Sequence, residues 1–197
     1  MATTKTSTRF PRVAGHPALD LVDTVHWRLD PGRAIDTLPS FDDAVAWCAE
    51  AGVLPGSAAE LERRGAADPA AAARELAAVQ ALREAVHDAA LDGSASASSL
   101  IAREYAAAVA RSSLEADAGA SRWSWRVPTD VTGPRAAVAL LAHELLTSDI
   151  GALRQCGDEA CGWLYLDTSP RHNRIWCTAA GCGNRNRVAR HQARKTP

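Results

Sequence analysis

The chain has 197 residues, of which 47% are hydrophobic and 23% are charged. This balance is typical of a soluble globular protein with one domain, or one domain plus a small module. No apolar run approaches the ~20 residues that a membrane helix needs. The N-terminal segment also has no apolar core of the kind found in secretory signals, so we expect a cytoplasmic protein.

The 42 alanines favour helix over sheet, so the predicted fold class is mainly α with minor β. Such an alanine content is also typical of a GC-rich bacterial gene. The net charge of −1 conceals an asymmetry between the two ends of the chain. Residues 1–150 hold 14 basic and 20 acidic residues, whereas residues 151–197 hold 8 basic and 3 acidic ones. A basic tail on an acidic body indicates an anionic partner for the tail.

The first helices are predicted from apolar spacing and from capping residues. Residues 1–14 show no pattern, and we expect them to be frayed. Apolar residues at helical spacing predict a helix over 17–29. Ser40 and Asp43 form a capping-box pattern for a helix over 41–51, with Gly52 as its stop.

Two further helices follow the same logic. Ser57 and Glu60 predict a second capping box for a short helix over 58–64. Pro69 suits the first position of a helix that runs to about Leu91.

The next segment is predicted to alternate between joints and regular elements. The serine-rich stretch 93–99 is a low-complexity joint that can cap a helix over 100–112. Alternating tryptophans predict a half-buried strand over 123–127. Gly133 and Pro134 break the chain before a helix over 135–148.

The C-terminal 47 residues follow a different pattern. A short strand is predicted over 162–167, and 174–177 can return beside it as the second strand of a hairpin. A basic helix is predicted over 184–194. Three arginines share one face of this helix at positions i, i+3 and i+7, namely Arg187, Arg190 and Arg194.

Four of the five cysteines fall within 27 residues, in the pattern C-x4-C-x15-C-x4-C. They are Cys156, Cys161, Cys177 and Cys182. Two chelating pairs joined by a spacer of hairpin length predict one zinc ion held by four thiolates. Because four cysteines close the coordination sphere, the site is expected to be structural rather than catalytic. Two disulfides, four unrelated thiols and an iron–sulfur cluster are the alternatives.

The basic residues near these cysteines could offset the thiolate charge or contact an anionic partner. The candidate DNA contacts are Arg171, Arg174, Asn184, Arg185, Arg187, Arg190, Arg194 and Lys195. Arginines can bind phosphates or guanine edges. A helix that is merely solvated is the plainer interpretation, and an acidic protein partner fits the residues as well as a nucleic acid does.

The cysteine-rich segment resembles the CGNR zinc-finger family. The resemblance is carried by CGW at 161–163, LDxS at 166–169, RxWC at 174–177 and CGNR at 182–185. It implies zinc at the four cysteines and a DNA-binding role. Pro170 and Ile175 depart from the family pattern, which more often has polar or basic residues there.

The preceding segment resembles the ABATE domain that the same family places before the finger. Gly15, the run LDLVDT at 19–24 and the run LLTSDIGALRQC at 145–156 carry this resemblance. It implies three parts: a frayed N-terminus at 1–14, an ABATE-like helical domain at 15–150 and the finger with its basic helix at 151–197. The implied function is a DNA-binding transcription regulator active in stress responses. Asp23 stands where the family usually has asparagine.

A small-molecule effector pocket is a further hypothesis for the first helix. Asp20, Asp23 and His26 could line such a pocket, although the polar side of an amphipathic helix plus one buried hydrogen bond is the favoured interpretation. Core packing is favoured over an aromatic cage for Trp27, Trp47, Trp123 and Trp125. Trp163 and Trp176 are expected to form the small core of the zinc module. Cys48 is expected to be a buried small hydrophobe.

No catalytic motif is complete. His143 and Glu144 begin like a zinc-protease motif, but Thr147 stands in place of the second histidine. We therefore expect no enzyme but a DNA-binding transcription regulator, with the N-terminal domain as sensor or oligomerisation domain. A homodimer is compatible with this role. The alternatives are a zinc-dependent protein-interaction adaptor and a small-molecule-binding protein without DNA contact.

Overall fold

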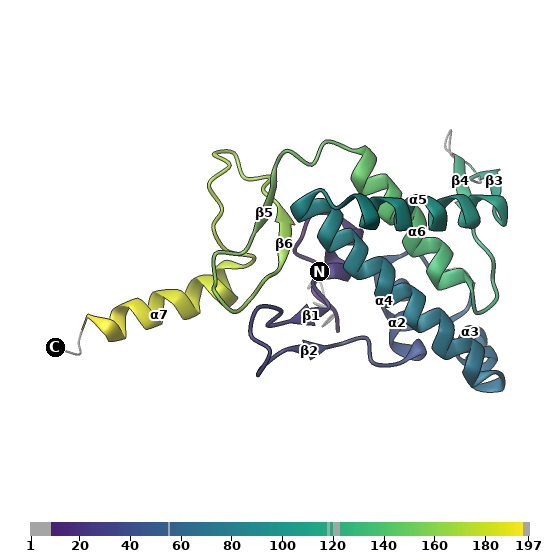
Figure 1. Cartoon of the computed structure of the whole chain (residues 1–197), viewed down its shortest axis with the longest axis horizontal. Helices are drawn as coiled ribbons and strands as arrows, with labels where there is room; N and C mark the ends of the chain where they lie inside the picture. Colours follow the sequence, from purple (N-terminus) through teal and green to yellow (C-terminus); the bar gives the residue numbers. More distant parts are fainter. Residues whose placement is uncertain (1–8, 55, 118, 120–122, 195–197) are drawn as a thin grey trace.

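The computed structural model describes residues 9–194 except for 55, 118 and 120–122. The described part is mainly helical with three two-stranded antiparallel sheets, so the predicted fold class is confirmed. Figure 1 shows an elongated molecule with most helices gathered at one end and a single helix projecting at the other. None of the described helices is long and apolar enough to cross a membrane.

The helices are α1 (Pro17–Val22), α2 (Phe41–Ala51), α3 (Ala58–Ala67), α4 (Pro69–Asp92), α5 (Ala95–Ala110), α6 (Gly133–Thr147) and α7 (Asn184–Ala193). The strands are β1 (Val25–His26), β2 (Ile35–Asp36), β3 (Ser113–Ala116), β4 (Trp123–Arg126), β5 (Leu153–Gln155) and β6 (Leu164–Leu166). α4, α5 and α6 pack on one another, and α1 and α2 pack against α4 and α6. One core runs from Trp47 and Leu82 in this helical body to Leu164 and Tyr165 beside the cysteines. The two ends of the chain therefore share a single hydrophobic core.

Local capping explains the helices that match their predicted bounds. Ser40 accepts the backbone N–H of Asp43 at 3.2 Å, and the Asp43 carboxylate accepts that of Ser40 at 3.0 Å. Gly52 ends α2 with φ of +75°. The capping box predicted for α3 is wrong, because the Ser57 side chain makes no cap hydrogen bond and Glu60 instead binds Arg64 at 2.6 Å.

The helix predicted over 17–29 is wrong beyond Val22. The carbonyl of Thr24 accepts the N–H of Thr37 at 3.0 Å, and β1 then pairs with β2. Trp27 has φ of +55°, which no helix allows. Leu29 is 48% exposed, so its place in the apolar periodicity does not reflect burial.

The predicted fraying of residues 1–14 is wrong for 9–14, while 1–8 lie outside the described residues. Phe10 and Ala14 are fully buried. The backbone N–H groups of Arg9 and Phe10 both donate to the Glu50 carboxylate at 3.2 Å. This segment, residues 9–14, is called the strap below.

Two predicted joints belong to helices. α5 begins at Ala95 because the Ser94 hydroxyl caps the N–H of Ala97 at 3.4 Å, so most of the serine-rich stretch is helical. Gly133 and Pro134 form the first turn of α6 rather than a break, since proline is tolerated at that position.

Both predicted β segments need correction. β4 forms and pairs with β3, but Trp123 is 64% exposed and Trp125 37% exposed, so neither tryptophan is core. β6 forms within 162–167, yet its partner is β5 and not 174–177. The backbone N–H of Arg174 donates to the Asp167 carboxylate at 2.9 Å instead of joining a strand.

Candidate metal centre and basic helix

The four C-terminal cysteines meet beside the β5–β6 sheet, as their spacing predicts. Their Sγ atoms all lie within 4.8 Å of one another. The Cys161 and Cys177 sulfurs are 3.8 Å apart, and those of Cys177 and Cys182 are 3.4 Å apart. Sulfurs held about 2.3 Å from a tetrahedral zinc lie about 3.8 Å from one another. The residues therefore fit a single tetrahedral metal ion.

Tight turns bring each cysteine pair together. In the first pair, Cys161 donates its N–H to the carbonyl of Asp158 at 3.0 Å, and Cys156 donates its N–H to the carbonyl of Trp163 at 2.8 Å. Gly162 follows with φ of +72°, and a Cβ there would come within 3.0 Å of Arg28 and Leu29. We call residues 156–161 the first knuckle and residues 15–150 the N-terminal module. Glycine is therefore required at position 162, where the first knuckle meets the N-terminal module.

The second pair is closed by a π-helical turn, Ala179–Gly183. The Thr178 hydroxyl accepts the N–H of Gly181 at 3.0 Å, and the Thr178 carbonyl accepts that of Gly183 at 3.0 Å. Trp176 packs against Gly183, where a Cβ would approach the indole to 3.1 Å. This turn delivers Cys182 directly to the start of α7.

The crowded sulfurs differ in acidity. The pKa of Cys156 is lowered because the thiols of Cys161 and Cys177 donate hydrogen bonds to it. The pKa values of Cys161 and Cys177 are raised because their protons are held in those bonds. Metal binding releases such thiol protons. Cys48 is different: it is buried in α2 as predicted, far from any such partner, and burial raises its pKa to about 12.

A buried carboxylate connects the first knuckle to α7. Oδ2 of Asp158 accepts hydrogen bonds from Arg185 at 3.0 Å and from the Asn186 amide at 2.8 Å. Arg185 also donates to the Cys182 sulfur at 2.9 Å. This places a positive charge directly on a ligand sulfur, as the thiolate charge requires. Arg185 thus faces the metal centre.

Trp27 extends this contact to the N-terminal module. The Arg185 guanidinium carbon lies 4.2 Å from the centroid of the Trp27 ring, and that of Arg33 lies 3.6 Å from it. Each is within the range of a cation–π interaction. The first turn of α7 is therefore fixed on one side by Asp158 and on the other by Trp27.

The β1–β2 connection binds the first knuckle through its backbone. Arg28 and Leu29 donate their N–H groups to the carbonyls of Cys161 and Ala160, at 3.1 and 3.2 Å. The Trp163 indole donates to the carbonyl of Val25 at 3.1 Å. The Arg28 side chain in turn pairs with Glu84 of α4. The knuckle is therefore hydrogen-bonded directly to the helical body.

The strap makes a second junction. The carbonyl of Ala14 accepts the N–H of Leu166 at 2.8 Å. Arg174 donates to the carbonyl of Val13 at 3.1 Å and to that of Trp176 at 2.9 Å, and its guanidinium lies 4.0 Å from the centre of the Tyr165 ring. Arg174, a candidate DNA contact, thus faces inward and joins the strap to the finger.

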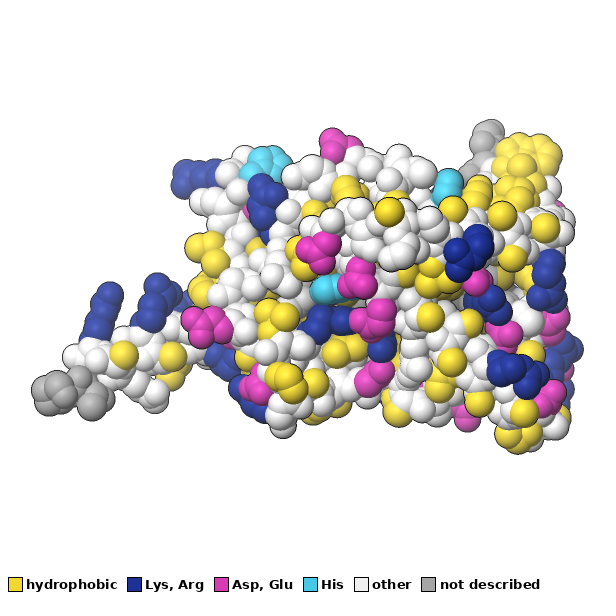
Figure 2. All heavy atoms as spheres, viewed as in Figure 1, with side chains coloured by type: hydrophobic (Ala, Val, Ile, Leu, Met, Phe, Trp, Pro, Cys, Tyr) yellow, Lys and Arg dark blue, Asp and Glu magenta, His cyan; other side chains and the backbone are white. Residues whose placement is uncertain are grey.

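The other candidate DNA contacts are exposed. No residue of α7 is buried, and Figure 1 shows the helix projecting away from the body. Figure 2 shows Lys and Arg side chains standing out along it. The exposed candidates are Arg171 in the loop after β6 and Asn184, Arg187, Arg190 and Arg194 in and beside α7. Lys195 lies outside the described residues.

The three effector-pocket candidates make internal contacts at separate places. Asp20 accepts the N–H groups of Val13 and Ala14 at 2.9 and 3.0 Å and lines a cavity of about 10 Å³ under the strap. His26 packs edge-on against Trp163, with ring centroids 5.1 Å apart, and lines a cavity of about 160 Å³ beside the cysteines.

The third candidate, Asp23, is fully buried where the two modules meet. Its Oδ1 accepts the N–H of Leu164 at 2.9 Å, and its Oδ2 has no hydrogen-bond partner. Burial raises its pKa well above the usual range. The Asp23 carboxyl has the same shape and nearly the same volume as the side chain of the asparagine expected at this position, so the departure is a conservative one.

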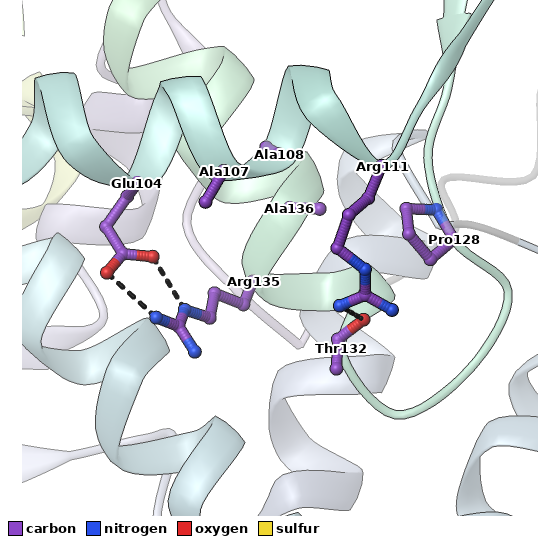
Figure 3. A pocket seen from close by; sticks show the side chains of 8 residues that line it. All are labelled: Glu104, Ala107, Ala108, Arg111, Pro128, Thr132, Arg135 and Ala136. Carbon is purple, nitrogen blue, oxygen red and sulfur yellow. Dashed lines mark hydrogen bonds and ion pairs between the residues drawn. The ribbon is translucent and has the colours of Figure 1, made fainter.

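A separate cavity of about 100 Å³ lies between α5 and α6, far from the cysteines (Figure 3). Arg135 binds Glu104 through two hydrogen bonds of 2.6 and 2.8 Å, and Arg111 donates to Thr132 at 2.8 Å. Alanines line the wall between these pairs. The ion pairs join α5 to α6 and to the connection before α6.

Sequence reasoning did not single out Asp158 and assigned Trp27 to core packing, whereas Trp27 is only half-buried and lies under Arg33 and Arg185. Asp158 lies inside the first C-x4-C spacing, where a side chain able to accept backbone N–H groups could have been noticed. Trp27 carried no such signal, because its position depends on contacts with the C-terminal residues.

Two family models match the chain. One, described as "CGNR zinc finger", matches residues 152–195. The other, ABATE, described as "Putative stress-induced transcription regulator", matches residues 15–149. A comparison with curated proteins gives no match. Both resemblances drawn from the sequence, and their order, are confirmed.

Proposed function

Because the chain belongs to the ABATE family and carries a C-terminal CGNR zinc finger, we propose that it is a non-enzymatic, DNA-binding transcription regulator of the cytoplasm. The observation that carries this proposal is α7. This basic helix starts two residues after the last cysteine, and all of its residues are accessible. Helices of this kind bind DNA phosphates and base edges.

The proposed metal is one structural zinc ion held by Cys156, Cys161, Cys177 and Cys182. Four thiolates complete a tetrahedral sphere and leave no position for a reactive water. Zinc would supply stability rather than chemistry, on the order of 10 kcal/mol for small fingers. Arg185 and the Cys177 backbone N–H, which lies 3.4 Å from the Cys156 sulfur, offset the charge of the thiolates.

The contact surface proposed for DNA is the exposed face of α7. A helix of ten residues with no buried side chain is marginal in water. Its first turn is held by Asp158 and Trp27, so the helix is already oriented when it meets DNA. Arg187, Arg190 and Arg194 then reach phosphates along one face, and Asn184 adds an exposed amide at the start of the helix.

The N-terminal module is proposed to sense a small-molecule effector or to oligomerise. It is joined to the finger through Trp27, Asp23 and the strap. A change in the β1–β2 connection would therefore reach α7 without a flexible linker between them. This is a physical route for regulation.

An acidic protein surface is the second candidate partner, favoured by one observation. Val188 is 46% exposed among the arginines of α7. An apolar residue on a basic helix is common in protein-binding helices. This second hypothesis predicts that the protein binds an acidic protein partner when no DNA is present.

The proposal is tested by fluorescence anisotropy of labelled duplexes against the zinc-loaded protein across a salt series. Arg187→Ala combined with Arg190→Ala should weaken binding and reduce the salt slope by up to about 2. The matched control is Arg74→Ala with Arg103→Ala, which removes the same charge from exposed positions of α4 and α5. An unchanged slope in the α7 variant, or equal losses in both variants, would exclude α7 as the DNA surface. If the zinc-loaded protein binds no duplex at low salt, the proposed role as a DNA-binding regulator is excluded.

A further inference from the structure

The β3–β4 hairpin separates its side chains into two different faces. Leu114 pairs with Trp125 across the strands, and Ala116 pairs with Trp123. Side chains alternate between faces along a strand, and paired residues share a face. These four residues therefore form one apolar face, which we call the hairpin face.

The hairpin face is open to solvent. Leu114 is 50% exposed, and Ala116 and both tryptophans are also exposed. Figure 2 shows hydrophobic side chains gathered at the end of the molecule where Figure 1 places β3 and β4. Tryptophan is a large apolar side chain that folded proteins mostly cover. Contiguous apolar surface of this kind marks an interaction site.

The charged residues that the structure describes around the hairpin face are paired. Arg126, on the opposite face of the hairpin, binds Asp117 at 3.0 Å and lies 3.6 Å from Glu115. Arg111 binds Asp130 at 3.1 Å beside it. The hairpin face itself carries no charged residue. A strongly charged partner would therefore find no unpaired opposite charge among these described residues, whereas a second uncharged apolar face would meet no repulsion.

We propose that the hairpin face is a self-association surface, on which a second copy of this chain packs the same face about a two-fold axis. A two-fold interface joins identical patches, so an uncharged face is complementary to itself. Two tryptophans and a leucine from each copy would bury on the order of 400 Å² per copy, about half of a standard interface. An interface of this size is expected to be weak and transient.

The position of the hairpin leaves the finger free in the dimer. β3 and β4 lie at the end of the molecule opposite α7 (Figure 1). Self-association gives the proposed oligomerisation role of the N-terminal module a defined surface. Loss of self-association should leave DNA binding unchanged, because the hairpin face and α7 are separate surfaces.

The experiment is sedimentation equilibrium of the zinc-loaded full chain from about 1 to 500 μM, a concentration range in which weak dimers dissociate. The wild type should convert from monomer to dimer within this range. Trp123→Lys places a charge on the hairpin face and should raise the dissociation constant at least tenfold. Ser124→Lys adds the same charge one residue along β4, on the opposite face, and should leave it within twofold.

Three outcomes would overturn the proposal. The first is a wild type that stays monomeric at the highest concentration. The second is equal dimerisation of both lysine variants, which would place the interface elsewhere. The third is growth beyond dimers, because a two-fold interface closes. Far-ultraviolet circular dichroism and DNA anisotropy at nanomolar protein should be the same for all three proteins, which separates this result from that of the proposed function.

Discussion

The two halves of the zinc finger differ in how they relate to the rest of the molecule. The first half, residues 156–167, is hydrogen-bonded to the β1–β2 connection, Asp23 and the strap, and its apolar residues belong to the main core. The second half ends in α7, which has no buried residue. The segment that the CGNR zinc-finger model matches, residues 152–195, thus combines a half packed on the body with an exposed helix.

This difference shows that the finger is not an independent unit on a linker. Two of the four cysteines, Cys156 and Cys161, belong to the docked half, whereas Cys182 leads into α7, where Arg185 contacts both Asp158 and Trp27. Changes on the docked side should therefore alter the stability of the whole chain. Changes at the exposed arginines of α7, Arg187, Arg190 and Arg194, should alter binding alone.

Removing a metal ligand should have the largest effect. Cys156→Ser is expected to abolish zinc binding and to lower the melting temperature of the entire chain, on the order of 10 °C or more, because the cysteines lie in the shared core. Calorimetry and metal analysis measure both. Cys48→Ala, at the buried cysteine outside the cluster, should keep one zinc per chain. If Cys156→Ser instead shows an additional unfolding transition at low temperature while the main transition keeps its wild-type temperature, the two ends of the chain do not share one core.

Substitution of Asp23 should have the second-largest effect on the free energy of unfolding, and this effect should depend on pH. Asp23→Ala leaves the buried N–H of Leu164 without a partner and should cost about 1–3 kcal/mol. Because the folded pKa of Asp23 is raised, the folded state keeps a proton that the unfolded chain loses above about pH 4. Stability contributed by this group is therefore present at low pH and is lost as pH rises towards the folded pKa.

Asp23→Asn tests directly whether stability falls as pH rises, since asparagine has no proton to lose. The variant should be more stable than the wild type at pH 8, and the difference should shrink towards pH 4. Urea unfolding at several pH values measures it. A constant difference across this range would show that Asp23 is ionised in the folded protein.

Replacing Trp27 should give a smaller effect, confined to α7. Trp27→Ala removes the aromatic face under Arg185 and should weaken DNA binding about fivefold, the equivalent of one cation–π contact. Zinc content should not change. Amide hydrogen exchange in α7 should become faster, and Trp27→Phe should restore both properties. Normal exchange in α7 of Trp27→Ala would remove Trp27 from any role in orienting the helix.

The exposed arginines of α7 should have the smallest effect on stability. Arg187→Ala with Arg190→Ala should shift the free energy of unfolding by less than about 0.5 kcal/mol, as is usual for open surface sites. Urea unfolding checks this beside the DNA measurement. A loss as large as that of Asp23→Ala would mean that α7 is packed rather than free.

The sequence predicted those features whose cause is local. The capping box of Ser40 and Asp43 and the spacing of the four cysteines each need only nearby residues, and both are confirmed. The serine-rich stretch before α5 shows the limit of this approach. Its composition is typical of a joint, yet one hydroxyl at Ser94 was enough to start a helix there.

Features set by distant residues could not be predicted in this way. The end of α1 and the left-handed backbone of Trp27 depend on pairing with residues 35–37 and on contacts with 160–163. The alternation around Trp123 and Trp125 correctly indicates one apolar face, but alternation does not say whether anything covers it. A count of arginines likewise does not show that Arg174 faces inward while Arg187 faces out.

The strap carries a consequence for how the chain is made. Val13 and Ala14 precede α1, yet their carbonyls accept hydrogen bonds from Arg174 and Leu166, which lie more than 150 residues later in the chain. Contacts between residues so distant in sequence form late and slow the closing of a fold. During synthesis the strap therefore stays without these partners until residues 166–174 have left the ribosome. Closure of the strap and assembly of the four-cysteine cluster thus belong to the same late step of folding.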